Sequence, residues 1–288
     1  MKAADFVLLT RFNLPSPGVQ SLIRAKEGWL RERAELFETY CLPSVTAQTS
    51  ASFTWLVYLD PESPTWLIER MTEHQRNGIL HPVYRESVSD DELVADIRQI
   101  VGTAGQYLVT TNLDNDDAVA IDFIARLQAA EIASTPVALY VTNGLIRSGS
   151  ALYRHHYPRN AFNSVCVDWA EPRTCWSEWH TDFGDVMPVI EIGGAPGWMQ
   201  VIHGSNVSNR VKGRRTAPEP LRASYGSLLD GVAAPRRRDT ARDVLIARPS
   251  RFVRESGRAL AKRIVVAVLG KGGIDRVQFA LRSRSKSG

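Results

Sequence analysis

The sequence predicts an α/β protein with a mixed, mainly parallel sheet and helices on both faces. Three observations lead to this expectation. Short apolar stretches alternate with longer stretches of helical periodicity through the first half of the chain, as in parallel sheets with crossover helices. Acidic residues follow two of the apolar stretches, where ligands of such sheets usually bind. Beyond about residue 145 the apolar stretches shorten between Gly, Pro, His and Trp, which predicts a strand-rich second half built onto the same sheet.

The first three elements come from the amino-terminal third. A buried strand is expected at residues 6–10, which are almost entirely apolar. Apolar residues at helical spacing from Leu22 to Tyr40 predict a long helix, which Pro43 should end. A second apolar strand is expected at residues 53–59, and Asp60 with the following proline ends it.

The next elements continue the alternation. Residues 65–77 have helical periodicity, and Gly78 is suited to cap that helix. A third strand is expected at residues 79–84. A Ser followed three residues later by Glu forms a capping box, which predicts a helix over residues 89–101.

The last elements of this pattern surround the acidic segment. A fourth strand is expected at residues 107–113, a helix at 118–133 and a fifth strand at 137–141. The apolar pieces of the second half are residues 164–167, 186–192 and 198–202.

The composition is that of a globular protein with an unusual end. Of 288 residues, 44% are hydrophobic and 23% are charged. Residues 235–288 contain 15 Lys and Arg but four Asp and Glu, whereas residues 1–234 contain 20 and 27. We therefore expect one large domain at 1–234 and a basic extension at 235–288.

Three carboxylates crowd the end of the fourth predicted strand, at Asp114, Asp116 and Asp117. Such a cluster requires a bound metal ion, a cationic substrate or exposure to water, because like charges repel. Two carboxylates one residue apart can share Mg²⁺ or Mn²⁺. The alternative is that Asp116 and Asp117 start the following helix, which explains Asp117 better than Asp114. An EF-hand does not fit, because Ala118 and Val119 stand where its third ligand and its glycine belong.

These acidic residues and the segments around them resemble those of a known class of enzyme. Asp60 and, about fifty residues later, D-x-D-D occur in the ordered segments "LLTRFN", "WLVYLD", "YLVTTNLDNDD" and "WMQVIHGSNVSNR". The set resembles GT-A nucleotide-sugar glycosyltransferases, which have a Rossmann-like fold, and more narrowly a family of bacterial rhamnosyltransferases. The likeness covers roughly residues 5–215. A haloacid-dehalogenase phosphatase also uses D-x-D, but on its first strand.

The resemblance implies roles for the acids. Asp60 would contact the nucleoside of the donor, and Asp114 would contact the nucleotide and, with Asp116, hold a Mn²⁺ or Mg²⁺ ion that bridges the diphosphate. Residues 1–144 would be the nucleotide-binding half and residues 145–234 the acceptor half.

A second candidate group follows the strand at 198–202. His203 is the residue that would complete the metal shell in this class, although a histidine hydrogen-bonded at a strand end is the simpler interpretation. Asn206 and Arg210 offer donors for diphosphate or sugar hydroxyls, and turn formation is the alternative.

Three further residues are candidate donor contacts. Arg11 and Asn13 follow the first strand and should lie at the same edge of the sheet as the aspartates. Arg98, on the helix before the fourth strand, resembles a donor-contacting arginine of related transferases. A solvated helix face is the alternative for Arg98.

The catalytic base is expected in the aromatic and polar segment around residues 176–182. An inverting transferase needs a group that takes the proton of the acceptor hydroxyl. Our order of preference is Asp182, His180 and then Glu178, and a retaining mechanism stays open. Trp176 and Trp179 are the best candidates for aromatic platforms under a sugar ring.

The basic extension has three interpretations: a solvated tail, a helix on a membrane surface, or a nucleic-acid contact, which is the weakest. Membrane contact would suit an enzyme that extends a lipid-linked glycan. Because no apolar run approaches roughly 18 residues and the amino end does not read as a signal peptide, we expect a cytoplasmic protein, peripheral on the inner face of the cell membrane if the tail binds there.

The sequence thus predicts a metal-dependent glycosyltransferase that moves a sugar from a nucleotide-sugar donor to a glycan or glycolipid acceptor. Rhamnose and a bacterial surface polysaccharide are implied by the resemblance alone. The alternatives are a metal-dependent phosphoryl or phosphate-ester hydrolase and a non-catalytic carbohydrate-binding protein.

Overall fold

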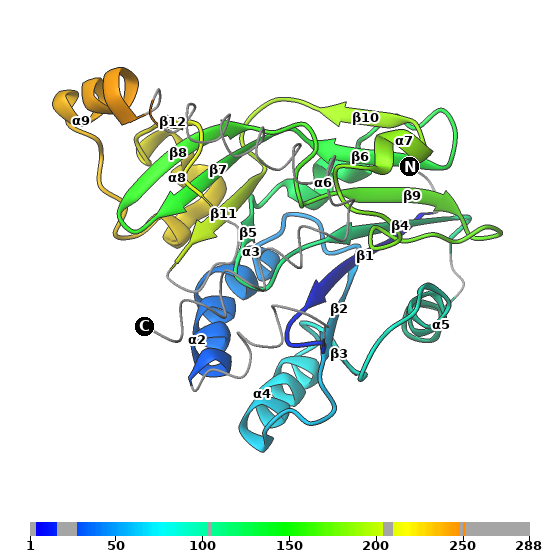
Figure 1. Cartoon of the computed structure of the whole chain (residues 1–288). Helices are drawn as coiled ribbons and strands as arrows, with labels where there is room; N and C mark the ends of the chain where they lie inside the picture. The colour runs from blue at the N-terminus through cyan, green and yellow to red at the C-terminus, as the bar shows by residue number, and fades with distance from the viewer. Residues whose placement is uncertain (1–3, 16–27, 103–104, 204–209, 248–249, 251–288) are drawn as a thin grey trace, which may run out of the picture. The chain divides into compact units, whose positions relative to one another are not determined.

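The computed structural model describes residues 4–15, 28–102, 105–203, 210–247 and 250 (Figure 1). The chain divides into two compact units. The first comprises residues 1–15 and 28–234, and the second comprises residues 16–27 and 235–288.

A seven-stranded sheet with the order β10-β6-β9-β4-β1-β2-β3 is the centre of the first unit. Its strands are β1 (Ala4–Arg11), β2 (Thr54–Leu59), β3 (His81–Tyr84), β4 (Tyr107–Asn112), β6 (Val137–Val141), β9 (Ser164–Asp168) and β10 (Val189–Ile192). β9 is antiparallel to both of its neighbours, whereas all the other pairs are parallel. The expected mixed, mainly parallel sheet is confirmed.

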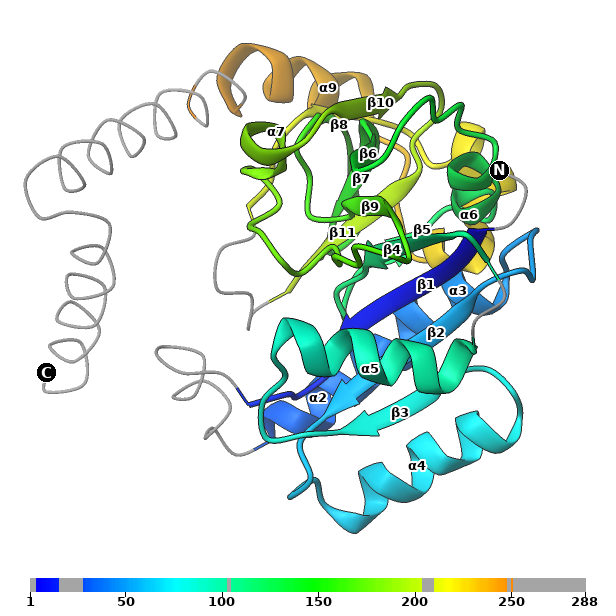
Figure 2. The same ribbon diagram turned by 90° about the vertical axis from the view of Figure 1, so that its right-hand side faces the viewer.

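Helices cover both faces of this sheet, as expected (Figure 2). Successive side chains of β1 enter different cores, Phe6 and Leu8 on one face and Val7 and Leu9 on the other. The first core includes residues of α2 (Trp29–Leu36), α3 (Leu42–Thr46), α4 (Thr65–Arg76) and α6 (Phe123–Gln128). The second includes residues of α5 (Asp90–Val101) and α7 (Phe183–Val186).

A second sheet corrects the expectation that the later strands all join the first. Its order is β12-β8-β7-β11-β5, from β5 (Ala118–Val119), β7 (Asn143–Ser148), β8 (Ala151–His156), β11 (Trp198–Ile202) and β12 (Arg214–Arg215). β7 and β8 form a tight antiparallel hairpin, and β11 pairs with β7, so these strands satisfy one another's backbone groups. A third core packs this sheet against η2 (Glu219–Leu221), α8 (Arg222–Tyr225) and η3 (Gly226–Leu229).

The segment after the aspartates is also different from the expectation of a helix over 118–133. Ala118 and Val119 are strand β5, and the helix is only α6, which begins at Phe123. The cause is tertiary, because β5 pairs with Trp198 and Met199 of β11. Local helical periodicity did not reveal this long-range pairing.

Pro43 does not end its helix, contrary to the prediction. Helix α2 continues through a π-helical turn, η1 (Phe37–Cys41), into α3, where Pro43 lies within the first two positions. A proline inside a helix removes one backbone hydrogen bond, and the π-helical turn lies directly before this interruption. Leu22 and the other residues of 16–27 lie outside the described part.

Two local signals are confirmed. Ser89 and Glu92 form the capping box at the start of α5. Gly78 follows the end of α4 with a φ of 69°, a conformation that favours glycine.

In the second unit, the structure describes α9 (Arg237–Arg242) and η4 (Asp243–Ala247). The apolar run at 264–269 lies outside the described residues. None of the helices described by the structure has the length and apolar character that crossing a bilayer requires.

Candidate functional site

The carboxyl ends of three neighbouring strands bring predicted residues to one edge of the large sheet. β1 lies between β2 and β4, with Arg11 opposite Tyr58 and Leu9 opposite Asn112. Asp60 follows β2 directly and Asp114 lies two residues after the end of β4, so both lie at the edge where β1 ends. This is the edge at which open α/β sheets bind ligands.

The second sheet brings His203 to the same place. β5 and β11 are antiparallel, with Ala118 opposite Met199. Continuing this register by two residues places Asp116 opposite Val201, close to the residue that follows β11. Asp116 and His203 therefore meet because a two-residue strand fixes the register of segments 87 residues apart.

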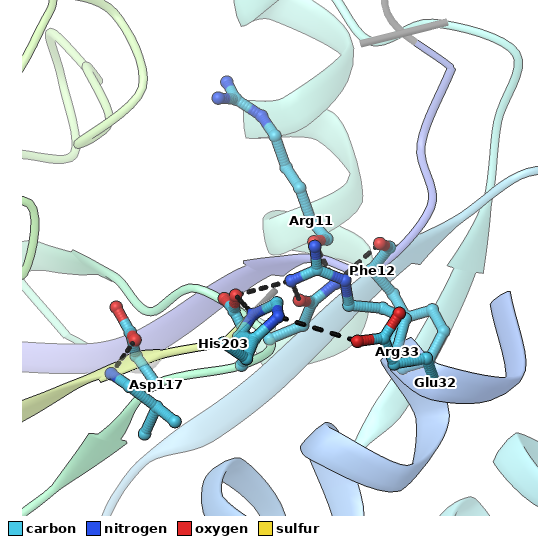
Figure 3. A network of polar contacts seen from close by, with 9 residues as sticks. Arg11, Phe12, Glu32, Arg33, Asp117 and His203 are labelled. Carbon is cyan, nitrogen blue, oxygen red and sulfur yellow. Dashed lines mark hydrogen bonds and ion pairs between the residues drawn. The ribbon is translucent and has the colours of Figure 1, made fainter. Parts of the chain in front are cut away.

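Asp116 is the centre of a polar network, and Figure 3 shows His203, Arg33 and Glu32 of this network close together. Its Oδ2 lies 2.6 Å from NH1 of Arg33 and 2.8 Å from Nε2 of His203. The other ring nitrogen of His203, Nδ1, lies 3.8 Å from Oε1 of Glu32. Burial alone would raise the pKa of Asp116, but the hydrogen bonds and charges of His203 and Arg33 outweigh it and lower that pKa. The carboxylate is thus kept ionised although it is buried.

Asn115 holds this network in place. Its Nδ2 donates to the backbone carbonyls of Arg11 and Phe12, at 3.0 and 2.6 Å. Its Oδ1 accepts a hydrogen bond from NH1 of Arg33 at 3.1 Å. Because two carbonyl acceptors fix the orientation of the amide, the oxygen must face Arg33.

Asp117 connects the acidic loop to β11, and it does not start a helix. Its Oδ1 accepts a hydrogen bond from the backbone N–H of Val201 at 2.8 Å, whereas its buried Oδ2 has no hydrogen-bond partner among the residues that the structure describes. Burial raises the pKa of Asp117 well above its ordinary value, and the charges of Asp116 and Asp114 add to the effect. Asp117 therefore acts by positioning the strand that delivers His203.

The donor set around Asp116 fits a divalent cation with few protein ligands. A carboxylate oxygen and an imidazole nitrogen already converge, and the second ring nitrogen faces a carboxylate, as is typical of metal-binding histidines. Within the described ranges, no three His, Cys, Asp or Glu residues are grouped to hold a metal ion. Mg²⁺ and Mn²⁺ often have one or two protein carboxylates and complete their shell with water and phosphate oxygens.

Asp114 lies beside this pair but faces solvent. Protein atoms still crowd its carboxyl group, and this loss of water, followed by the charge of Asp116, raises its pKa. Nδ2 of Asn112 is 3.3 Å from its Oδ1. Asn112 also accepts a hydrogen bond from Nε1 of Trp176 at 2.7 Å, and the guanidinium of Arg11 stacks 4.0 Å over the Trp176 ring. Arg11 and Asp114 are thus neighbours, as the sequence predicted.

Asp60 and Asn13 form a turn at the ends of β1 and β2. The backbone N–H of Asp60 donates to Oδ1 of Asn13, and Nδ2 of Asn13 donates to Oγ of Ser63 at 3.0 Å. The Oδ1 of Asp60 accepts the backbone N–H of Glu62 at 2.8 Å. These contacts of both side chains hold the loop, and the roles of Asp60 and Asn13 toward a nucleotide stay predictions.

Arg98 is not brought to this edge. Its NH2 donates to the carbonyl of Trp169, which follows β9 next to Asp168. Asp168 pairs with Tyr107, the first residue of β4, so Arg98 lies at the opposite edge of the sheet from Asp114. Of the two other predicted donor contacts, Asn206 lies outside the described residues and Arg210 is exposed.

The three candidate bases lie on the segment that follows Trp176. Glu178 is exposed. Asp182 is exposed and its Oδ1 accepts the hydroxyl of Thr181 at 2.7 Å. His180 packs edge-on against Tyr157 with ring centres 6.4 Å apart, and burial lowers the pKa of His180 although the charge of Asp182 opposes it. Their catalytic roles stay predictions.

Sequence reasoning missed Arg33, Asn115 and Glu32. An arginine and a glutamate on a helix are ordinarily a solvated face, and the middle residue of D-x-D carries no charge. Arg33 contacts Asp116 across 83 positions of the chain, a distance at which periodicity gives no signal. One indication was present, since Arg33 is adjacent to Ala34, which is buried.

A family model matches residues 5–215 and identifies the class of protein as a glycosyltransferase. Within that class, the chain belongs to the family described as "Putative rhamnosyl transferase". The resemblance stated from the sequence is thereby confirmed. None of the curated proteins matches the chain.

Solved structures with similar folds have low identity to this chain. The crystal structure of S. aureus TarS 1-349 matches with a TM-score of 0.41 and 10% identity, over 68% of this chain and 60% of that one. GalNAc-T7 with UDP, GalNAc and Mn²⁺ matches with a TM-score of 0.41 and 12% identity, over 69% of this chain and 43% of that one. The inositol-1-phosphate CTP transferase from T. maritima has a TM-score of 0.38 and 10% identity, over 81% of this chain and 99% of that one. The chain therefore spans 60% of the TarS fragment and less than half of GalNAc-T7.

Proposed function

We propose that this protein transfers a sugar, with rhamnose the first candidate, from a nucleotide-sugar donor to a glycan or glycolipid, with a divalent metal at Asp116 and His203. One observation carries the proposal. An ionised, buried carboxylate and an imidazole converge within 2.8 Å at the ligand-binding edge of the sheet, although they come from distant segments. The family of the chain supplies the reaction class.

Asp116 and His203 would hold the Mn²⁺ or Mg²⁺ ion, with Asp114 within reach of its waters. The ion, when bound, supplies positive charge for the diphosphate that leaves. Oε1 of Glu32 lies 3.8 Å from the other ring nitrogen of His203 and adds negative charge beside the imidazole. Asp117 holds β11 in register and so sets the position of His203.

The residues at the end of β1 would position the donor. Arg11 has its guanidinium stacked on Trp176 beside Asp114, where it can donate to phosphate or ribose oxygens. Trp176 is itself held by Asn112 at the end of β4. Asp60 at the end of β2 remains the proposed contact to the nucleoside.

For the proton of the acceptor hydroxyl, His180 has the environment best suited among the three candidates. Burial lowers its pKa, so its imidazole is unprotonated at neutral pH and can accept a proton. Glu178 and Asp182 are exposed, and the latter already accepts a hydrogen bond. Contact of the basic segment 235–288 with an anionic membrane would bring the enzyme to a lipid-linked acceptor.

The test is release of nucleoside diphosphate from UDP-, GDP- and dTDP-sugars, including dTDP-rhamnose, with Mn²⁺ and with EDTA. We expect release from one class of donor, dependent on metal. His203→Gln should lower the rate about a hundredfold or more. His156→Gln is the matched control, because His156 is an exposed histidine of β8 whose ring bonds Asn143.

Two results contradict the proposal. Release of inorganic phosphate from simple esters, with no action on sugar nucleotides, would indicate a hydrolase. Sugar binding without metal-stimulated nucleotide binding, measured by calorimetry, would indicate a carbohydrate-binding protein.

A further inference from the structure

Arg33 occupies the position at Asp116 where a cation is expected. Its NH1 lies 2.6 Å from Oδ2 of Asp116 and 3.1 Å from Oδ1 of Asn115. Its guanidinium also lies 5.2 Å from the centre of the Trp29 ring. The side chain is only 13% exposed, so this is a partly desolvated ion pair and not a surface contact.

The structure holds Arg33 there through Asn115. The two backbone carbonyls that accept from Nδ2 of Asn115 leave its oxygen directed at the guanidinium. The amide of the middle residue of the D-x-D segment is thus engaged within the protein, and its oxygen holds the arginine that contacts the neighbouring aspartate.

The contact with Asp116 is nevertheless one that a competitor can break. One guanidinium nitrogen makes it, and it ends on the same oxygen that His203 contacts. A parallel pair of hydrogen bonds to both carboxylate oxygens would be stronger. A divalent cation at Asp116 and His203 needs this oxygen and would meet the charge of Arg33 within a few ångströms.

We propose that Arg33 is a resident counter-ion which the divalent metal displaces from Asp116, and that the released guanidinium then binds oxygens of the donor diphosphate. This inference rests on the proposed function, because it takes Asp116 as a metal ligand. Arg33 keeps the buried carboxylate neutralised without metal, and its release places a second positive charge beside the leaving group.

The mechanism couples the two ligands. Metal binding frees Arg33 for the diphosphate, and a bound diphosphate holds Arg33 away from Asp116, so each ligand strengthens the other by the same factor. Removing the guanidinium has opposite effects on the two affinities. A merely structural arginine would not produce this pair of opposite changes.

The experiment is calorimetric titration of the full chain with Mn²⁺ alone, and then with UDP, GDP and dTDP at saturating Mn²⁺. Arg33→Gln should bind Mn²⁺ alone about tenfold more tightly than the wild type, because the competing charge is gone. The same variant should bind the preferred nucleoside diphosphate about tenfold more weakly. Arg31→Gln is the matched control, because Arg31 is exposed on the same helix and stacks on Trp66 instead. It should resemble the wild type in both titrations.

A second measurement uses the wild-type chain and does not depend on the folding of the Arg33 variant. Displacement of Arg33 removes its charge from the Trp29 ring, so Mg²⁺ should change the tryptophan fluorescence. That change should be absent from Trp29→Phe.

Three outcomes separate the inference from the function on which it rests. Tighter Mn²⁺ binding and weaker diphosphate binding by Arg33→Gln support it. Unchanged or weaker Mn²⁺ binding by this variant, while Asp116→Asn abolishes binding, overturns the role of Arg33 and leaves the proposed metal site intact. Absence of Mn²⁺ binding by the wild type, even with nucleoside diphosphate, overturns both. If Arg33→Gln does not fold, unchanged wild-type fluorescence under saturating Mg²⁺ overturns the displacement.

Discussion

Two buried aspartates in this protein are each paired with an arginine, and the two pairs are built differently. Asp96 and Asp116 are both 7% exposed. Asp96 accepts from Nε and NH2 of Arg85 on separate oxygens, and the hydroxyl of Tyr58 adds a third hydrogen bond at 3.1 Å. At Asp116, Arg33 and His203 converge on one oxygen.

The two arginines thus contact their carboxylates in different ways, and the candidate site is at the second pair. The Arg85–Asp96 pair joins residues 11 positions apart, uses both oxygens and is closed by a tyrosine. The Arg33–Asp116 pair joins segments 83 positions apart, and one guanidinium nitrogen contacts the same carboxylate oxygen as His203. Buried charge alone therefore does not distinguish the two aspartates, whereas the way in which each arginine contacts its carboxylate does.

The largest expected effect is on turnover. Asp116→Asn should lower nucleoside diphosphate release about a thousandfold or more, because the carboxylate that attracts the metal is lost. The rate is measured at saturating donor and Mn²⁺. Asp96→Asn is the control and should keep its rate per folded molecule. An active Asp116→Asn enzyme would remove the distinction between the two pairs.

The next effect is on stability and belongs to the other pair. Arg85→Met should lower the free energy of unfolding by about 2–4 kcal/mol, because Asp96 is left buried without its partner. Urea denaturation measures the loss. Arg70→Met, which breaks the exposed pair of Arg70 with Glu38, should cost less than about 1 kcal/mol. Similar losses in the two variants would contradict the view that the first pair is structural.

The pH dependence of metal binding distinguishes the two donors at the site. Because the pKa of Asp116 is already below its ordinary value, its carboxylate takes up no proton between pH 7 and 5. An imidazole binds a metal ion only through an unprotonated nitrogen, so protons compete with the metal at His203. Mn²⁺ affinity should therefore fall on the order of tenfold from pH 7 to 5 in the wild type. His203→Gln should bind Mn²⁺ more weakly than the wild type at pH 7, and an unchanged affinity in that variant would assign the effect elsewhere.

A smaller effect is expected where Arg11 stacks. Trp176→Leu removes the ring under the guanidinium and the N–H that bonds Asn112. We expect the Kd of the nucleoside diphosphate to rise roughly tenfold, without loss of Mn²⁺ binding. Trp179→Leu is the control, because Trp179 is 67% exposed. Equal Kd values for the Trp176 variant and the wild type would show that Arg11 is positioned by other contacts.

The smallest effect is expected at Arg98. Since it lies at the opposite edge of the sheet, Arg98→Ala should change turnover by less than about twofold. Steady-state rates at varied donor concentration measure this. A large rise in KM for the donor would place the nucleotide elsewhere than we propose.

The elements of the first half follow from the sequence because their signals are local. The capping box at Ser89, the apolar strand before Asp114 and the glycine after α4 each act within a few residues. The two-residue strand β5 and the path of the chain through Pro43 depend on distant partners, which periodicity does not contain. The same limit applied to the helix expected at 118–133.

The candidate site could be predicted only in part, for the same reason. Asp116 and His203 were predicted as partners from a family resemblance, and the structure places them together. Arg33 was not predicted, because its partner is chosen by the docking of α2 and by the orientation of Asn115. Interactions of this kind are set by tertiary packing, so they become visible only in three dimensions.

The pairing of β5 with β11 has a thermodynamic consequence. Asp116 lies between β4 of the first sheet and β5 of the second, and His203 directly follows β11 of the second sheet. An ion bound by both residues would therefore link the two sheets. An ion that binds only the folded chain stabilises it by mass action, by about 2.7 kcal/mol at a hundred times its Kd. Melting curves recorded with increasing Mn²⁺ should thus shift upward before any sugar nucleotide is added. This shift would report binding of the ion at the loop between the two sheets.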